Sequence, residues 1–316
     1  MSQSSAINRS LCVAAFAVVA APWCPVALLR LSAQQHDEGL HERFKTEAPV
    51  KWAEYRRRAE NLQGKMTMSA SIDGRRDAAK KSEYLRNATS RRLLEQSVLP
   101  GDSTGTMYVV NPRYSFILKR SAPDAAWLLD SVNTSESGGS TELIGRRLSS
   151  PSLAVQVLTS MYAMPLLDVV QKSNFKVRTV RRANVGGQSL VEVRFDYPNV
   201  WRKEEDQTYI PIQSGVLWLD PEQFWCVREA ELHLKTLVGT GVHTERREFV
   251  VKNGSFPIPT RGGSEQNWKL SEGKTMKIQS VSEMDLDVPA TLPDDEEFRL
   301  SAFGLPEPHG VEWKKP

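Results

Sequence analysis

The chain has 316 residues, with 41 lysines and arginines against 38 aspartates and glutamates and a net charge of +3. Such a near balance argues against a dedicated nucleic-acid binder, in which basic residues are concentrated. Cys12 and Cys24 lie close to the N-terminus, so Cys226 stands alone in the rest of the chain and no intramolecular disulfide is expected there. Cys226 lies between two apolar residues and is expected to be a buried, inert thiol.

The first 33 residues are expected to be a targeting segment. Arg9 is the only charged residue before an uncharged stretch over residues 11–29, and its continuous apolar part covers residues 11–21. A short positive region followed by an apolar run is typical of a signal peptide. The continuous apolar part, residues 11–21, is shorter than a membrane span requires. We expect cleavage after residue 33 and export to the periplasm or another extracytoplasmic space. The alternative is an uncleaved anchor at residues 11–29, and membrane contact is expected through this segment alone.

Residues 34–48 are polar and are expected to form a linker. A short helix is predicted from Pro49, because proline suits the first turn of a helix. Four apolar residues recur on one face of this helix, at the spacing of a helix that packs on a core: Trp52, Tyr55, Ala59 and Leu62.

Beyond this helix, apolar residues recur at every second position in a series of short segments, which is the period of a half-buried strand. Turn signals such as Asp73-Gly74, Gly239-Thr240-Gly241 and Asn253-Gly254 separate the segments. The predicted strands cover residues 66–72, 84–94, 107–110, 114–118, 126–132, 175–182, 191–197, 216–219, 225–234, 244–251 and 276–284.

So many strands joined by short turns indicate an antiparallel meander, and a sheet of this size must curl. The sequence therefore predicts a mainly β (α+β) fold over residues 49–285, built as a large curled antiparallel sheet or unclosed half-barrel. Residues 286–316 are rich in proline and acidic residues, and this tail is expected to wrap over the sheet.

One strongly apolar helix is predicted over residues 153–164, after Pro151. Its polar side chains, Gln156, Thr159 and Ser160, occupy a single narrow stripe. A helix that is apolar around most of its circumference is buried on several sides. We expect this helix to lie on the concave face of the curled sheet.

The residues able to do chemistry do not form a recognisable active site. His233 and His243 lie on the two arms of the predicted hairpin at residues 239–241, where they could be cross-strand neighbours. With Glu231 or Glu245 nearby they would make a minimal zinc site, although two exposed polar positions on a sheet are the favoured interpretation. No enzymatic activity, metal or cofactor is therefore expected.

The hairpin over residues 215–225, Gly-Val-Leu-Trp-Leu-Asp-Pro-Glu-Gln-Phe-Trp, resembles one that is common in the superfamily of outer-membrane lipoprotein carriers (LolA/LolB-like). The order of elements over residues 45–285 is similar as well, with a helix, a long meander, an apolar helix and a second meander. Residues 297–308 resemble the closing segment of a group of uncharacterised exported bacterial proteins. No functional residue of the carriers matches a position in this chain, so none is assigned from the resemblance.

The resemblance implies an unclosed barrel that holds helices against its concave face and binds lipid acyl chains in its apolar interior. We therefore expect an exported binding protein for a lipid or for the acyl chain of a lipoprotein. The alternative is an envelope scaffold, a protein-interaction module with a fully packed core and an envelope protein as its partner. The side chains expected to line the cavity are Met66, Met68, Tyr114, Phe116, Leu118, Val157, Leu158, Met161, Val191, Val193 and Phe195.

Overall fold

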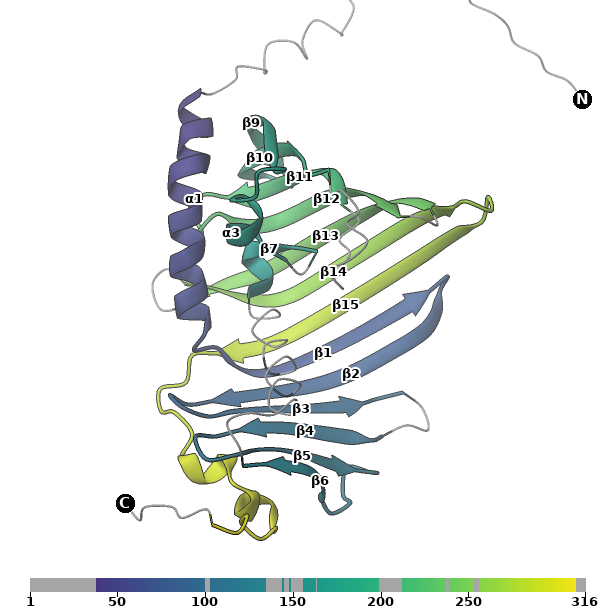
Figure 1. Ribbon diagram of the computed structural model, residues 1–316. Coiled ribbons are helices and arrows are strands. Elements are labelled where there is room, and N and C mark those ends of the chain that lie inside the picture. Colours follow the sequence, from purple (N-terminus) through teal and green to yellow (C-terminus); the bar gives the residue numbers. More distant parts are fainter. Residues whose placement is uncertain are drawn as a thin grey trace, which may run out of the picture. The chain divides into compact units, whose positions relative to one another are not determined.

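The fold is built from fifteen described strands and a few helices (Figure 1). The computed structural model describes residues 38–99, 103–134, 144, 148, 156–162, 164–198, 212–236, 239–252 and 256–310. The strands are β1 (Gln63–Ile72), β2 (Arg75–Arg86), β3 (Arg91–Ser97), β4 (Gly105–Val110), β5 (Ser115–Arg120), β6 (Leu128–Asn133), β7 (Ser160–Met161), β8 (Met164–Pro165), β9 (Lys176–Val185), β10 (Gln188–Asp196), β11 (Ile212–Asp220), β12 (Cys226–Thr236), β13 (Gly239–Lys252), β14 (Phe256–Leu270) and β15 (Thr275–Asp287).

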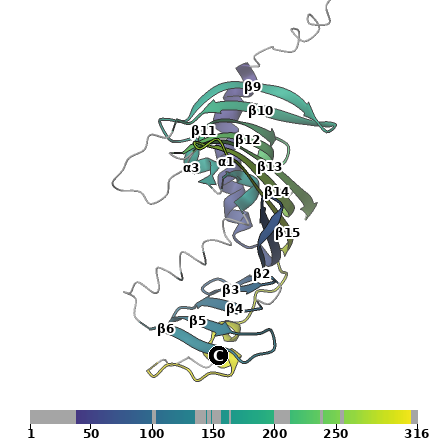
Figure 2. The ribbon, with the colours of Figure 1, turned by 90° about the vertical axis from the view of Figure 1, so that its right-hand side faces the viewer.

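Thirteen of these strands form one antiparallel sheet, in the order β6-β5-β4-β3-β2-β1-β15-β14-β13-β12-β11-β10-β9. Neighbours in the sheet are consecutive in the chain, except that β15 returns to pair with β1. The sheet is not closed, and its edges are β6 and the curved strand β9 (Figure 2). The prediction of a mainly β fold with a large antiparallel sheet is confirmed.

The two faces of the sheet are distinguished by what packs on them. We call the side on which the N-terminal helix lies the α1 face, and the opposite side the outer face. In β4 and β5 both faces are buried: Val109 and Phe116 pack on the outer face, and Ile117 packs on the α1 face with Ile144 and Leu148. Because successive side chains of a strand point to opposite sides, this part of the sheet is apolar at nearly every position.

The N-terminal helix α1 spans Glu38–Ala59 and crosses the strands (Figure 1). It begins well before Pro49, so the expected helix start is wrong, and from Glu38 onward the expected linker is helical. The reason is that Leu40, Phe44 and Ala48 continue the apolar stripe towards the N-terminus, and all three are buried against the sheet. Pro49 therefore lies inside the helix.

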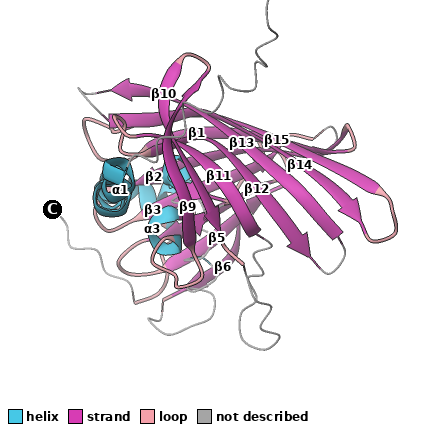
Figure 3. Ribbon diagram, turned by 90° about the horizontal axis from the view of Figure 1, so that it is seen from above, coloured by secondary structure: helices cyan, strands magenta, loops and turns pink. Residues whose placement is uncertain are grey.

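Helix α1 is fixed to the sheet at its C-terminal half by aromatic residues. The indole Nε1 of Trp52 donates a hydrogen bond of 2.9 Å to the carbonyl of Trp225. Tyr55 stacks on Phe256 of β14, with 5.2 Å between the ring centroids. The short helix α3 (Leu166–Val169) contributes to the same core and lies on the same side of the sheet as α1 (Figure 3).

The apolar helix predicted over residues 153–164 is not found in the described part of that segment. A 3-10 turn, η2 (Gln156–Thr159), leads directly into the hairpin of β7 and β8. Tyr162, between them, has a φ of +48°, which ends any right-handed helix. Residues 151–155 lie outside the described part of the chain.

Two predicted boundaries within the sheet are also wrong. The expected strand over residues 84–94 is broken by a turn, in which the Oδ1 of Asn87 accepts hydrogen bonds from the N–H groups of Thr89 and Ser90 at 3.0 and 2.8 Å. The turn expected at residues 239–241 belongs to β13. There Gly241 permits the close approach of Trp268, since a Cβ would meet the indole at 2.9 Å.

Strand β14 was not predicted at all, because Pro257, Pro259, Gly262 and Gly263 weaken the strand pattern. The two prolines lie where β14 pairs with β13 but not yet with β15, whose register begins at Arg261. A proline can occupy such a half-edge position because no N–H group is needed on the unpaired side.

The C-terminal tail packs on the outer face of β3 to β5 through two 3-10 turns, η3 (Asp295–Phe298) and η4 (Leu300–Phe303). Phe298 and Leu300 are buried there. The side chain of Asn111 donates to the Phe298 carbonyl at 2.8 Å, and the Leu300 N–H donates to the hydroxyl of Tyr114 at 2.9 Å.

Residues His36–Pro316 form one unit that is separate from Met1–Gln35. The targeting segment expected over residues 1–33 lies outside the described residues, as does the Asn253-Gly254 turn.

Candidate functional site

The residues predicted to line a cavity are divided among separate packed clusters. Met161, Val191, Val193 and Phe195 lie in the core under α1. Leu158 lies in a second cluster, against which Met66 and Val157 pack. Tyr114, Phe116 and Leu118 face the C-terminal tail on the outer face. Met68 is the only predicted lining residue that belongs to none of these clusters.

A hollow of about 380 Å³ lies on the α1 face, and it includes Met68 and Val157 of the predicted residues. We call it the α1-face hollow. Its floor comes from β13, β14, β15 and β1, which are neighbours in the sheet. Its wall comes from the segment of η2 and β7. The residues that line it are Met68, Val157, Ser160, Tyr162, His243, Glu245, Arg246, Arg247, Gly262, Gly263, Ser264, Gln266, Ser280 and Ser282.

Three ionisable side chains of β13 reach the α1 face together. His243, Glu245 and Arg247 alternate along the strand, so all three point to the same side of the sheet. The His243 Nε2 lies 2.7 Å from Oε1 of Glu245, and the guanidinium of Arg247 donates to the other carboxylate oxygen. The relative exposure of His243 and Arg247 is only 4 % each. Ionisable groups so deeply buried require partners, and each of these side chains has at least one.

The carboxylate of Glu245 is held in its ionised form. Burial by itself would raise its pKa, but the charge of Arg247, the hydrogen bond from His243 and the N–H of Tyr162 lower the pKa to about 2. The Tyr162 N–H donates to the Glu245 Oε1 at 3.0 Å. Glu245 is therefore occupied by three donors and is not available as a general base.

Arg247 explains why the described residues of the expected apolar helix, 156–162, are not α-helical. Its Nη1 donates hydrogen bonds to the carbonyls of Val157 and Ser160, the second at 2.6 Å. Those carbonyls would accept intrahelical bonds if residues 153–164 were one α-helix. Together with the Glu245 contact to Tyr162, the ion pair fixes η2 and β7 in a non-helical conformation over the sheet.

Aromatic and polar groups complete the hollow. The Tyr162 ring meets the His243 ring edge to face, with 5.1 Å between centroids. On the floor, the hydroxyls of Ser264 and Ser280 are 2.8 Å apart, and Ser282 donates to the carbonyl of Gly262 at 3.4 Å. These small residues leave space above the sheet next to the buried ion pair.

His233 and His243 lie on opposite faces of the sheet, so they are not the neighbours that a shared zinc site would require. The favoured prediction of two exposed positions is confirmed for His233 and wrong for His243. In the register of β12 and β13, His243 faces Leu232 and His233 faces Val242. A one-residue offset reverses the direction of a strand side chain, so His233 is exposed on the outer face while His243 is buried. Among the described residues no group of three or more histidines, cysteines, aspartates or glutamates is arranged to hold a metal ion.

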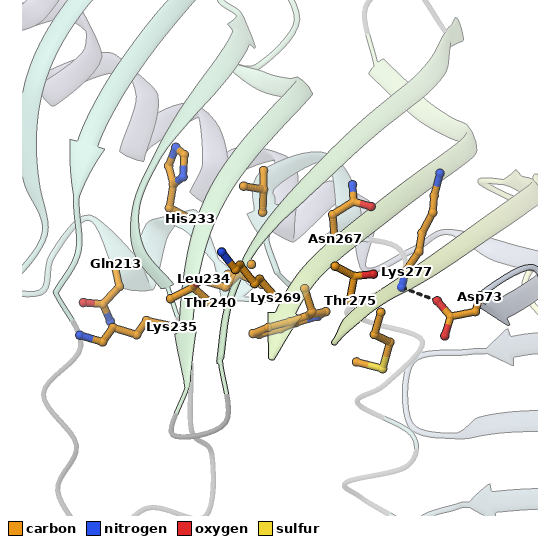
Figure 4. Close-up of a pocket in the computed structure, with 14 residues that line it drawn as sticks. Asp73, Gln213, His233, Leu234, Lys235, Thr240, Asn267, Lys269, Thr275 and Lys277 are labelled. Carbon is orange, nitrogen blue, oxygen red and sulfur yellow. Dashed lines mark hydrogen bonds between the residues drawn. The ribbon is translucent and has the colours of Figure 1, made fainter. Parts of the chain in front are cut away.

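His233 instead lines a second hollow, of about 630 Å³, at the turn ends of β12 to β15 (Figure 4). Lys235, Lys269 and Lys277 also border it. Its charges are partly neutralised, because Lys277 forms an ion pair of 2.8 Å with Glu265. The Asp73 carboxylate accepts a 2.8 Å hydrogen bond from the Lys277 backbone N–H, as the dashed line marks. This hollow has no buried ionisable group.

The spacing of three ionisable residues in the sequence indicates the buried group. His243, Glu245 and Arg247 follow one another at every second position, so a strand places them on one face. Nothing in the residues alone shows that this face is covered by η2 and β7. The single cysteine beyond the N-terminal segment, Cys226, is fully buried as expected, and burial raises the pKa of its thiol.

Comparison with known proteins gives no assignment: no protein-family model matches the chain, and no protein of described function matches its sequence. The helices in the described ranges are too short or too polar to cross a membrane.

Proposed function

We propose that this chain is an exported, non-enzymatic binding protein that holds an apolar ligand, a lipid or the acyl chain of a lipoprotein, in the α1-face hollow of an unclosed half-barrel. The observation that carries the proposal is the hollow itself, which remains open beside well-packed clusters. At about 380 Å³ it lies within the range of about 300–1,000 Å³ of small-ligand sites.

The border of the hollow suits an aliphatic ligand. Met68 has a relative exposure of 37 % although it lies in the middle of β1, and Val157 borders the other side. A partly exposed methionine is adaptable, because its unbranched thioether fits ligands of irregular shape. Exposed apolar surface inside a hollow is a reason to expect a ligand, since covering it removes apolar area from water.

Binding accounts for the ionisable groups better than catalysis does. Glu245 is saturated with donors, and Arg247 is engaged by one carboxylate and two carbonyls. A catalytic base or acid must be able to exchange a proton with a substrate. The buried group therefore serves to hold the wall of the hollow in place.

A second candidate function is an envelope scaffold or protein-interaction module that has a packed core and no ligand. The observation that favours it is the dense packing of the other predicted lining residues: Leu158, Phe116 and Val193 have no exposed surface. In that case the α1-face hollow is a gap left between small side chains, and it binds no ligand.

The two functions are separated by titrating the purified protein with a fatty acid that carries an environment-sensitive fluorophore. We expect saturable binding, with competition by unlabelled fatty acid. The variant Met68→Lys should weaken binding about tenfold or more, because it brings a charge to the apolar border.

Val281→Lys is the matched control. Val281 is equally exposed, at 37 %, but its strand pairs with β1 so that it lies opposite Ser69 on the outer face. This variant should bind the probe like the unmodified protein. If the folded protein shows no saturable binding, the carrier proposal is wrong and the packed scaffold remains.

A further inference from the structure

Two buried side-chain atoms of residues that line the α1-face hollow have no hydrogen-bond partner among the described residues. They are the Nδ1 of His243 and the Nε of Arg247. Both residues line the hollow, and each is more than nine-tenths buried. An unpaired polar group in the interior costs free energy, so such groups normally have a partner.

The chemistry of the two atoms follows from the bonds that their side chains already make. A carboxylate only accepts hydrogen bonds, so the Nε2 of His243 carries the hydrogen that it shares with Glu245. In the neutral imidazole the Nδ1 is then an acceptor. The Nε of Arg247 is a donor. A free acceptor at His243 is the complement of a hydroxyl hydrogen, and a free donor at Arg247, four positions further along β13, is the complement of another oxygen of the ligand.

The surroundings favour a neutral partner. Arg247 and Glu245 balance each other's charge, so this end of the hollow carries no net charge when the imidazole is neutral. Ser264 and Ser280 supply hydroxyls, and Met68 and Val157 supply the apolar border. A charged headgroup would lose its hydration here without finding an opposite charge that is free, so a fatty acid should bind through its chain but less tightly than a neutral lipid.

We propose that the α1-face hollow recognises a neutral, hydroxyl-bearing headgroup on an aliphatic chain, with the Nδ1 of His243 accepting a hydrogen bond from the ligand hydroxyl. The inference rests on the proposed function, because it names the headgroup of the ligand that the hollow would bind. The Arg247 Nε donates to an oxygen of the same headgroup.

The test uses a matched pair of probes, monododecanoyl glycerol and methyl dodecanoate, which share a chain and an ester but differ in their hydroxyls. Their binding to the full chain is measured by competition against the fluorescent fatty acid, below the concentration at which either forms micelles. We expect the glycerol ester to bind about five- to tenfold more tightly, the ratio typical of one buried hydrogen bond. Dodecyl glucoside, tested in parallel, distinguishes a sugar headgroup from a glyceride headgroup.

The imidazole nitrogen chemical shifts of His243, measured by NMR, are a second test, in which the protein measured carries no substitution in the core. Addition of monododecanoyl glycerol should shift the Nδ1 resonance of His243 and leave its Nε2 resonance in place, whereas methyl dodecanoate should shift neither. His233→Gln should retain the preference, because His233 lies on the outer face. The chain has five histidines, and the resonances that disappear in His243→Phe assign the His243 signals. His243→Phe should bind both probes equally.

The outcomes distinguish this inference from the function on which it rests. If neither probe binds to the folded protein, the proposed function fails. If both probes bind with equal affinity and the Nδ1 resonance does not move, the binding function stands and the headgroup inference is overturned.

Discussion

Glu245 shows how a single carboxylate can determine local structure. It receives hydrogen bonds from His243, Arg247 and the backbone of Tyr162, and its side chain is only 9 % exposed. Removing one partner of a buried ion pair leaves the other charge without compensation, which costs about 3–5 kcal/mol. The position of β7 over the sheet therefore depends on an ionised residue 245.

This ionisation gives the stability a defined dependence on pH. The pKa of Glu245 in the folded protein, about 2, lies below the value of 4.5 for a free glutamate. The carboxylate thus contributes stability above about pH 4.5, and that contribution is lost as the pH falls towards 2. We expect Glu245→Gln to lower the free energy of unfolding at pH 7 by about 3 kcal/mol.

Urea denaturation at several pH values checks this expectation. The difference between the unmodified protein and Glu245→Gln should shrink as the pH is lowered from about 4.5 to about 2. Glu248→Gln is the control, because Glu248 is exposed on the same strand. A difference that stays constant with pH would show that the ionisation of Glu245 does not contribute to stability.

At the scale of elements, β13 and β14 are long strands whose glycines are not equivalent. Gly241 faces Trp268, and a Cβ there would approach the indole Cδ2 to 2.9 Å. Gly263 has open space, since the nearest atom to its Cβ would be 3.9 Å away. The first glycine is thus required by the close packing of two strands, and the second is not.

We expect Gly241→Ala to lower the free energy of unfolding by about 1–3 kcal/mol, because Trp268 must move from its place in the core. Gly263→Ala should be neutral or stabilising by a few tenths of a kcal/mol, since it restricts the unfolded chain at no steric cost. Thermal unfolding followed by circular dichroism measures both. Equal effects of the two substitutions would contradict the packing argument.

At the scale of the whole molecule, the sheet is covered on opposite sides by segments far apart in the sequence. Helix α1 covers the α1 face of β9 to β12, and the C-terminal tail covers the outer face of β3 to β5. Phe298 has no exposed surface, although it follows the acidic run at residues 294–297. The part of the tail around Phe298 therefore belongs to the core.

Phe298→Ala should destabilise the protein by about 3–5 kcal/mol, the usual cost of removing a fully buried aromatic ring. Leu292→Ala should change the free energy of unfolding by less than about 0.5 kcal/mol, because Leu292 is 48 % exposed just before η3. Denaturant unfolding of both variants is the measurement. A small effect of Phe298→Ala would mean that the tail can leave the sheet.

The sequence by itself determined the class of the fold. Apolar residues alternate with polar ones in several segments, and this pattern depends only on the geometry of a strand. It can therefore be recognised without knowing which strands are neighbours, as in Met66, Met68 and Ala70, or in Val191, Val193 and Phe195. The antiparallel arrangement followed from the short turns. The carrier function, the ligand and the export of the chain stay predictions.

Only the tertiary structure decided where these elements end and which side chains meet. Residues 153–164 carry the pattern of an apolar helix, but the buried Arg247 takes the carbonyls that the helix would use. Likewise, a one-residue register offset placed His243 inside and His233 outside. Local patterns report which face of an element is apolar, whereas pairing register and buried charges depend on residues distant in the chain, and these fix the site.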